Sequence, residues 1–384
     1  MPIRNSSTRT TTTTRWRRTR PPSTSASNQS THRRSAFARP SDPATDATAP
    51  HNQNQGLKNP MRTPADEEFF ERELATFLPD KIFDAHCHLW RGQYMPAWSL
   101  DGTPGDAGYA EYMNAISDLH GDRTDGALFL SYAEPGDEEA QHGSNAWHAE
   151  QTALGKNCRG LFFVTPKDDP EWVRQEVRRL GMHGLKCYHS FADVTPTWEA
   201  SIPDFLPEPL VAVANEEGWA ITLHMVKSRA VADPDNIHWI RKYCETYPDM
   251  RLILAHSARG FQPVHNLEGL PHLTGLDNLY FDTSANCEPI AHQAIIRIIG
   301  HDKLMYGSDL PVSNLRGRSL SAADTFLWLY EESPVWGEKH LKIDPVLIGL
   351  EHLRSVKHAC WSERLDDNAV EDIFWNNAAR LFGL

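Results

Sequence analysis

Short apolar runs alternate with amphipathic segments along this chain from residue 81 onward. Eight of the runs have the length and the nearly continuous apolar character of strands that are buried on both faces. They cover residues 81–90, 126–133, 158–166, 184–189, 219–226, 251–260, 278–285 and 303–312. Because an amphipathic segment follows each run, the pattern predicts a parallel sheet that is covered by helices.

Several of the intervening segments show helical periodicity, with Asp or Pro near the first residue. They cover residues 169–181, 207–218, 233–248 and 289–300. Eight strand–helix units over about three hundred residues most simply close into a barrel. The sequence therefore predicts an α/β fold, specifically a (β/α)₈ TIM barrel.

The first 60 residues differ in composition from the rest of the chain. Ten Lys and Arg residues stand there against Asp42 and Asp46, and Ser and Thr are abundant. So few apolar residues cannot offset the conformational entropy of an ordered segment. We therefore expect residues 1–60 to be a disordered Arg/Ser/Thr-rich extension and residues 61–384 to form the barrel domain. Such an extension is typical of an organelle transit peptide, and the alternative is a translation start at Met61.

The remainder of the chain is strongly acidic, because the whole sequence has a net charge of −13 despite its basic beginning. A nucleic-acid surface needs a basic stripe, so we expect no nucleic-acid partner. No run of eighteen apolar residues occurs, which predicts that no segment spans a membrane. The six cysteines show no CxxC spacing and several lie in apolar runs, as is typical of reduced thiols in a cytoplasmic protein.

Two histidines lie one residue apart in the first apolar run, KIFDAHCHLW. Side chains alternate along a strand, so His86 and His88 are expected on the same face. The carboxyl ends of later runs carry further polar side chains, namely Lys186, His189, His224, His256 and Asp309. Each of them alone is explained by a polar strand end in water. In a TIM barrel, however, all of these ends meet at one mouth where active sites lie, which predicts a metal site.

The types of these side chains indicate which metal the site would take. Imidazole and carboxylate ligands suit Zn²⁺ best, with Mn²⁺ or Fe²⁺ as alternatives. We predict that one ion is held by four ligands, His86, His88, His224 and Asp309. Such an ion lowers the pKa of a bound water from 15.7 towards about 7, which supplies hydroxide at neutral pH. Asp309 would also shuttle a proton, and His256 would polarise a substrate oxygen or act as an acid–base group.

The order of these residues resembles the amidohydrolase superfamily, with His-x-His on strand one, His on strands five and six, and Asp in YGSDLP on strand eight. The segments LILAHSARG, LMYGSDLPV and EDIFWNNAARLFGL are similar to its amidohydrolase-related branch, also called amidohydrolase 2. The resemblance covers about residues 80–384. It implies a metal-dependent enzyme. The known activities of that branch include lactone hydrolysis, hydration, and non-oxidative decarboxylation of aromatic or unsaturated carboxylic acids.

Lys186 bears on the number of metal ions. In some members of the superfamily a lysine on strand four is carboxylated and bridges two metals, whereas in the amidohydrolase-related branch it more usually accompanies one. We favour one ion, beside which the Lys186 ammonium would anchor a substrate carboxylate. Arg259 is a second candidate for carboxylate binding, with a surface salt bridge as its alternative. Three aromatic residues, Tyr188, His189 and Trp90, are candidates for lining the pocket. The alternative for these three is that they pack in the core.

Two segments, residues 91–126 and 313–345, are longer than ordinary barrel connections and would lie over the mouth as a lid. Trp98, Trp328 and Trp336 in these segments would form a pocket roof or a contact in a homo-oligomer. We expect a metal-dependent hydrolase whose partner is a small anionic lactone, amide or ester. The alternatives are a decarboxylase that uses the same ligands and an inactive barrel that serves as a scaffold.

Overall fold

The computed structural model describes residues 62–96, 98, 100, 105–134, 138–338, 340 and 343–384. The extension that was predicted over residues 1–60 lies outside the described residues, and its disorder stays a prediction. The chain divides into two units, residues 1–41 and residues 42–384, and the barrel belongs to the second. Among the described residues, no helix combines the length and the apolar character needed to cross a membrane.

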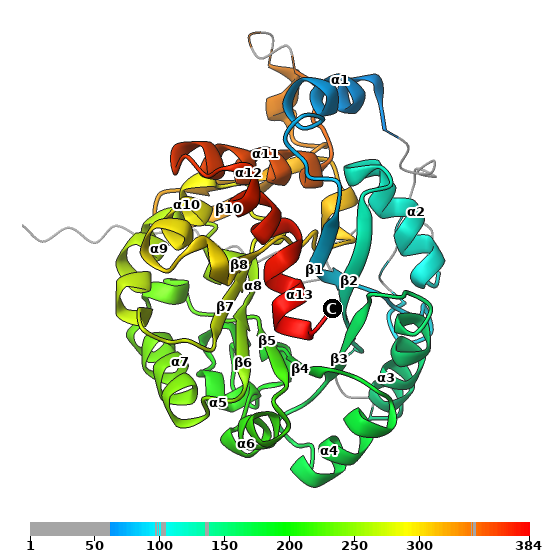
Figure 1. Cartoon of the computed structure of the whole chain (residues 1–384), viewed down its shortest axis with the longest axis vertical. Helices are drawn as coiled ribbons and strands as arrows, with labels where there is room; N and C mark the ends of the chain where they lie inside the picture. The colour runs from blue at the N-terminus through cyan, green and yellow to red at the C-terminus, as the bar shows by residue number, and fades with distance from the viewer. Residues whose placement is uncertain are drawn as a thin grey trace, which may run out of the picture. The chain divides into compact units, whose positions relative to one another are not determined.

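Eight parallel strands form one sheet in which each strand neighbours the next along the chain (Figure 1). They are β1 (Ile82–His88), β2 (Thr124–Leu130), β3 (Arg159–Phe163), β4 (Gly184–Cys187), β5 (Ala220–Leu223), β6 (Arg251–Leu254), β7 (Leu279–Asp282) and β8 (Leu304–Met305). Each strand overlaps one of the eight predicted runs. The predicted (β/α)₈ TIM barrel is therefore confirmed. The later strands are shorter than their runs because the final residues of those runs leave the ladder and enter the loops at the mouth.

The barrel closes between β1 and the segment after β8. The Asp309 N–H donates to the His86 carbonyl at 2.6 Å, and the His88 N–H donates to the Leu310 carbonyl at 3.0 Å. Cys87 and Leu310 form an isolated parallel bridge at the same place. The closure therefore fixes the His-x-His motif directly against the turn that carries Asp309.

Helices cover the outside of the sheet (Figure 1). The longer ones are α1 (Pro64–Glu73), α2 (Tyr109–His120), α3 (Glu138–Thr152), α4 (Pro170–Arg179), α6 (Glu208–Glu217), α7 (Pro234–Thr246), α10 (Pro289–Ile298) and α11 (Ile348–Ser362). The shorter ones are α5 (Ile202–Phe205), α8 (Ala255–Arg259), α9 (Pro263–Gly269), α12 (Asp367–Glu371) and α13 (Asn377–Phe382). Helices α4, α6, α7 and α10 lie within the four segments with predicted helical periodicity. Asp169 caps α4 and Asp233 caps α7, and each helix has Pro at its start.

The interior of the barrel is apolar at the end opposite the mouth. Phe83, Leu128 and Ile253 pack there with Leu381 of α13, so the C-terminal helix covers the amino ends of the strands. Two surface hollows beside α13 are lined by Arg251, among other residues, and neither includes a predicted site residue. Neither hollow therefore belongs to the predicted site.

The segment 313–345 contains an antiparallel hairpin of β9 (Gly317–Ala322) and β10 (Thr325–Tyr330). The Trp328 ring lies 5.6 Å from the ring of Phe261, which follows β6, so the hairpin packs on the loop that carries His256. Trp336 instead donates from Nε1 to the Tyr330 carbonyl at 2.8 Å. Lid closure and an oligomer contact for these segments stay predictions.

A chain that starts at Met61 is expected to unfold at the same temperature as the full chain, because the first 60 residues have too little apolar surface to form a core. Thermal unfolding followed by circular dichroism checks this. A chain that starts at Asp80 is the control. It lacks α1, in which buried Asp66 pairs with Arg316 at 2.6 Å, and should unfold several degrees lower. A comparable drop for the Met61 chain would contradict the prediction.

His352 of α11 is expected to limit stability in acid. It is buried, and neither ring nitrogen has a hydrogen-bond partner among the described residues. Burial lowers the pKa of His352 well below its ordinary value, so below about pH 6.5 the unfolded chain takes up a proton that the folded chain does not. The folded state therefore loses stability as the pH falls.

The substitution His352→Phe removes this group and preserves the stacking of the ring on Tyr306, at 5.4 Å. It should stabilise the protein by about 1–3 kcal/mol at pH 7.5, and by more at pH 5. Urea unfolding at the two pH values measures the difference. The control is His358→Phe on the same helix, where the side chain is partly exposed. An equal gain at both pH values would refute the pH argument.

Candidate metal centre

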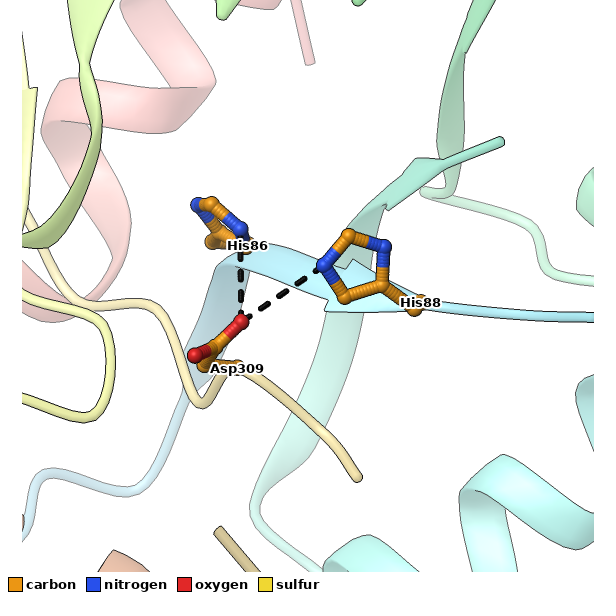
Figure 2. Close-up of side chains that lie close together, drawn as sticks. All are labelled: His86, His88 and Asp309. Carbon is orange, nitrogen blue, oxygen red and sulfur yellow. Dashed lines mark ion pairs between the residues drawn. The ribbon is translucent and has the colours of Figure 1, made fainter. Parts of the chain in front are cut away.

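Three of the four predicted ligands meet at the mouth of the barrel (Figure 2). Asp309 Oδ1 lies 3.4 Å from His86 Nε2 and 3.5 Å from His88 Nε2. One donor atom from each of the three side chains lies within 4.8 Å of the others, and all three side chains are buried. This spacing is close enough for the three donor atoms to bind one ion.

A bulge in β1 and a turn after β8 bring the three side chains together. Asp84 pairs with Ala127 and Cys87 pairs with Phe129, so β1 carries one extra residue between these pairs. Asp309 adopts a left-handed conformation, with φ of 61°. The sequence predicted that His86 and His88 share a face, but it did not predict the bulge or the turn.

The carboxylate of Asp84 ties the two segments to each other. It accepts hydrogen bonds from the Ser308 N–H at 2.7 Å and hydroxyl at 2.6 Å, and from the Tyr112 hydroxyl at 3.0 Å. Burial raises the pKa of Asp84 to about 6 although these hydrogen bonds oppose the rise. Asp84 was not predicted as a site residue, and its role is to hold the residue before Asp309 against β1.

Hydrogen bonds donated by the Nδ1 atoms orient both imidazoles. His86 Nδ1 lies 2.8 Å from Asp282 Oδ2, and His88 Nδ1 lies 3.3 Å from the Leu130 carbonyl. Burial is the largest cause that lowers the pKa of His86, to about 4, and it also lowers the pKa of His88. Both rings are therefore neutral, and since their partners only accept, the proton of each ring is on Nδ1. The lone pair of each Nε2 faces Asp309.

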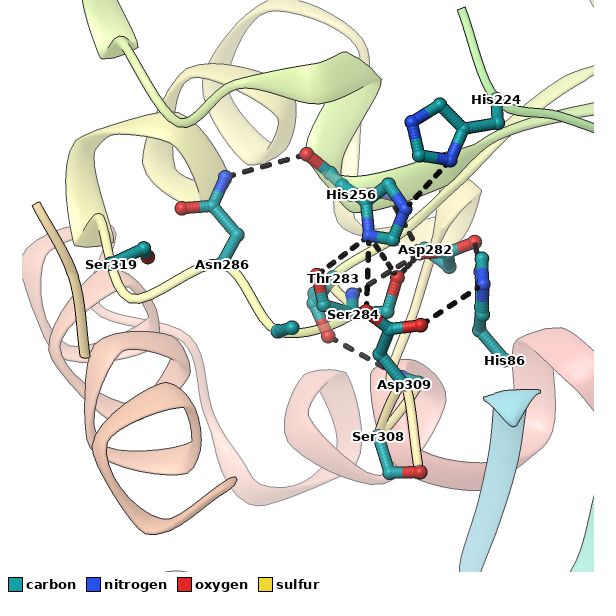
Figure 3. Close-up of polar contacts among 12 residues, drawn as sticks. His86, His224, His256, Asp282, Thr283, Ser284, Asn286, Ser308, Asp309 and Ser319 are labelled. Atoms are coloured by element: carbon teal, nitrogen blue, oxygen red, sulfur yellow. Dashed lines mark hydrogen bonds and ion pairs between the residues drawn. The ribbon is translucent and has the colours of Figure 1, made fainter. Parts of the chain in front are cut away.

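His224 follows β5 and lies beside His256 (Figure 3). His256 Nε2 lies 3.3 Å from His224 Nδ1, and His256 Nδ1 lies 3.1 Å from the Ser284 carbonyl and 3.8 Å from Asp309 Oδ2. A carbonyl only accepts, so His256 donates from Nδ1. If His224 supplies the proton between His224 Nδ1 and His256 Nε2, the lone pair of His224 lies on Nε2.

The sequence of this barrel matches a known family. The family model described as Amidohydrolase aligns with residues 83–384, which is most of the chain. The chain belongs to the amidohydrolase family. The match confirms the predicted resemblance to the amidohydrolase-related branch, and the members of the family are enzymes, both hydrolases and decarboxylases.

Solved structures with similar folds include an amidohydrolase from Burkholderia multivorans with bound zinc, at 14% identity and a TM-score of 0.52. The match covers 79% of this chain and 99% of that one. Another is a probable 2-pyrone-4,6-dicarboxylic acid hydrolase from Acinetobacter baumannii with bound citric acid, at 13% identity and a TM-score of 0.51. That match covers 79% of this chain and 100% of the other. At these identities the likeness shows the amidohydrolase fold alone. No curated protein matches the sequence.

Amidohydrolases are typically metal-dependent, and the buried side chains of this chain fit a divalent ion. Two neutral imidazoles direct Nε2 lone pairs towards a carboxylate, and nitrogen and oxygen donors of this kind suit Zn²⁺ and its neighbours. His224 Nε2 is a buried atom without a hydrogen-bond partner among the described residues. It lies outside the group of three, beyond His256, and its role as fourth ligand stays a prediction.

His256 lies in a left-handed turn that the sequence did not predict. Residues 256–259 have φ values of 57°, 53°, 58° and 54°, so the expected strand over 251–260 ends at Leu254. Such a conformation costs about 1–2 kcal/mol per residue. Hydrogen bonds offset this cost: Asn266 Nδ2 donates to the Ser257 carbonyl at 2.8 Å, and Asn286 Nδ2 donates to that of His256 at 3.3 Å.

Lys186 of β4 is buried inside the barrel, between Leu185 and Cys187, which pack outward beneath the helices. Its Nζ has no hydrogen-bond partner in the described part of the chain and lies 4.8 Å from the centre of the Tyr188 ring. Burial lowers the pKa of Lys186 to about 8. A buried amine without a partner fits both a substrate carboxylate and a carbamate, so the number of ions stays a prediction.

The predicted pocket residues differ in their surroundings. His189 Nδ1 contacts Thr197 Oγ1 at 3.0 Å, while its Nε2 has no partner among the described residues. Arg259 donates to the Lys227 carbonyl at 2.9 Å, and burial lowers the pKa of Arg259 to about 10. Its alternative interpretation as a member of a surface salt bridge stays open. Its role in binding a substrate stays a prediction.

The aromatic residues form one wall of the mouth. Trp98 lies with its ring centre 5.4 Å from that of His88, and it stacks on Tyr132 at 5.8 Å. The Tyr188 ring lies 4.4 Å from Tyr132. Trp90 is buried, contacts Trp98 at 5.4 Å and donates to the Gly105 carbonyl at 3.1 Å. Trp98, rather than Trp90, contacts the predicted ligand His88, and Tyr132 stacks on Trp98.

Proposed function

We propose that this protein is a metal-dependent hydrolase of small anionic lactones, amides or esters, with a single divalent ion for which Zn²⁺ is the best candidate. The observation that carries the proposal is the buried group of His86, His88 and Asp309 at the mouth, with both imidazoles neutral. His224 would complete the ligand set through its Nε2. The ion supplies Lewis acidity, which makes water acidic enough to lose a proton near neutral pH.

The side chains of the protein would share the remaining work. Asp309 accepts the proton of the attacking water. His256, with Nδ1 3.8 Å from Asp309 Oδ2, polarises the substrate oxygen or protonates the leaving group. Lys186, buried and without a partner among the described residues, binds the substrate carboxylate. The wall of Trp98, Tyr132 and Tyr188 excludes water from one side of the substrate.

A decarboxylase is the second candidate, and the position of Lys186 favours it. The Lys186 ammonium lies over the Tyr188 ring, whose neighbour Tyr132 stacks on Trp98. A cation beside flat aromatic side chains suits a planar, unsaturated carboxylic acid. The same metal ligands would serve this reaction, in which a carbon atom is protonated and no water attacks.

A substrate panel distinguishes the two reactions. The metal-loaded protein is incubated with lactones, esters, amides, and aromatic or unsaturated carboxylic acids, in a pH-stat with CO₂ detection. Hydrolysis of a lactone or ester releases acid and no CO₂, which is the expected result. If a carboxylic acid releases CO₂ and no lactone, ester or amide is hydrolysed, the protein is a decarboxylase and the proposed hydrolase function is wrong. A protein that binds no metal and turns over no substrate would be the inactive scaffold.

A further inference from the structure

Asp282, at the end of β7, is a buried carboxylate whose two oxygens face different parts of the site (Figure 3). Oδ2 lies 2.8 Å from His86 Nδ1. Oδ1 accepts from the His256 N–H at 3.0 Å and from the Ser284 N–H at 3.1 Å, and also from the Ser284 hydroxyl. The carboxylate therefore contacts the segments after β6 and β7 as well as the His-x-His motif on β1.

The bond from Oδ2 fixes the form of His86 that can bind a metal. A neutral imidazole has one proton, and the carboxylate holds that proton on Nδ1, which leaves the lone pair on Nε2. Carboxylates in this position raise the basicity of a ligating imidazole and fix the orientation of its ring.

The bonds to Oδ1 fix the start of the left-handed turn. The backbone N–H of His256 donates to Asp282 Oδ1, and His256 Nδ1 lies 2.9 Å from the Ser284 hydroxyl. Ser284 is in turn bonded to Asp282. A turn of non-glycine residues in this conformation persists only where its surroundings determine it, and Asp282 is one of the groups that do so.

We propose that Asp282 is a positioning residue that couples the His86 metal ligand to His256. Its one carboxylate fixes both the proton on His86 Nδ1 and the backbone conformation at His256. The inference rests on the proposed function in one respect, because it assumes that His86 binds an ion. A single carboxylate with both oxygens in use cannot be replaced by an amide, since the NH₂ group would face a donor on one side or the other.

The variant Asp282→Asn tests the proposal. Its affinity for Zn²⁺, measured by competition with a chromophoric chelator at one pH, is expected to fall 10- to 100-fold. Hydrogen exchange of the His256 backbone N–H is expected to become faster, because an amide either turns its NH₂ group towards this N–H or accepts from it more weakly than the carboxylate does. The second measurement needs no metal and tests the coupling directly.

The matched control is Asp66→Asn. Asp66 is equally buried and accepts from Arg316 at 2.6 Å and from the Leu347 N–H at 3.0 Å, and it contacts no histidine of the site. This control should lower the melting temperature and leave both Zn²⁺ affinity and exchange at His256 unchanged. Equal Zn²⁺ affinity in Asp282→Asn and wild type, or exchange at His256 that does not change, would overturn the proposal.

A measurement on the wild-type chain covers the case in which Asp282→Asn fails to fold. Nitrogen-15 NMR of histidine-labelled protein without metal should place the His86 proton on Nδ1, and a proton on Nε2 would overturn the proposal. Failure of the proposed function has a different signature, because the wild-type chain itself would then bind no Zn²⁺. The two failures are thus distinguishable.

Discussion

His86→Ala is expected to remove most of the bound divalent metal, together with the activity. The substitution deletes one of the donors that face Asp309, and it leaves Asp282 Oδ2 buried without its hydrogen bond from Nδ1. Metal binding contributes to the stability of the folded state, so the melting temperature should fall mainly for the metal-loaded protein. Metal content per chain after gel filtration, and melting curves with and without added Zn²⁺, measure both effects.

His120→Ala is the matched control for this experiment. His120 is also a buried histidine, with Nε2 2.8 Å from the Tyr306 hydroxyl and Nδ1 2.8 Å from Thr124 Oγ1, but it lies outside the mouth. Its loss should destabilise the fold by creating a cavity and leaving an unpaired hydroxyl, with metal content unchanged. If His86→Ala kept the metal content of wild type, the assignment of the metal site would be wrong.

The sequence could predict those parts of the site that depend on strand geometry. His86 and His88 share a face because side chains alternate, and Asp309 meets them because the carboxyl ends of parallel strands lie together. The distances of 3.4 and 3.5 Å between their donor atoms agree with that expectation. The same rule applies to Asp282, an acidic residue near the end of the seventh predicted strand, although it was not among the predicted site residues.

The left-handed turn at His256 could not be predicted in the same way. A positive φ is usually indicated by Gly, but the first Gly in AHSARG is Gly260, after the turn. What holds the turn is distant in sequence: Asp282, Asn266 and Asn286 reach it from other segments. Local propensity therefore favoured a continuing strand, and tertiary hydrogen bonds decided otherwise.

The hairpin in the segment 313–345 is an intermediate case. TFLWLY has the composition of a strand, yet only a partner in antiparallel register makes a strand out of it. Residues 317–322 supply that partner, with Leu327 opposite Leu320. Since such register depends on a turn that lacks a strong sequence signal, the segment was predicted only as a long loop over the mouth.

His256→Asn and Lys186→Met are expected to separate the roles of these two residues. His256 contacts His224 and Ser284 but lies outside the group that faces one ion, so His256→Asn should keep the metal and lose roughly 10²–10⁴-fold in turnover. Lys186→Met should instead raise KM for a carboxylate substrate, with little change in kcat if the contact is equally strong in the ground and transition states. Kinetics on the substrate found in the panel measure both.

The number of metal ions per chain tests the single-ion site on which these separate roles of His256 and Lys186 depend. With one ion, wild type and both variants should each hold one. If Lys186 were a carbamate that bridges two ions together with His224 and His256, wild type would hold nearly two, and both substitutions would reduce that number. Lys227→Met is the control, because Lys227 is a partly buried lysine that pairs with Asp235 at 3.3 Å and should affect neither metal content nor KM. A wild-type value near two that falls in both variants of the site would replace the single-ion mechanism, since Lys186 would then hold metal and could not bind the substrate carboxylate.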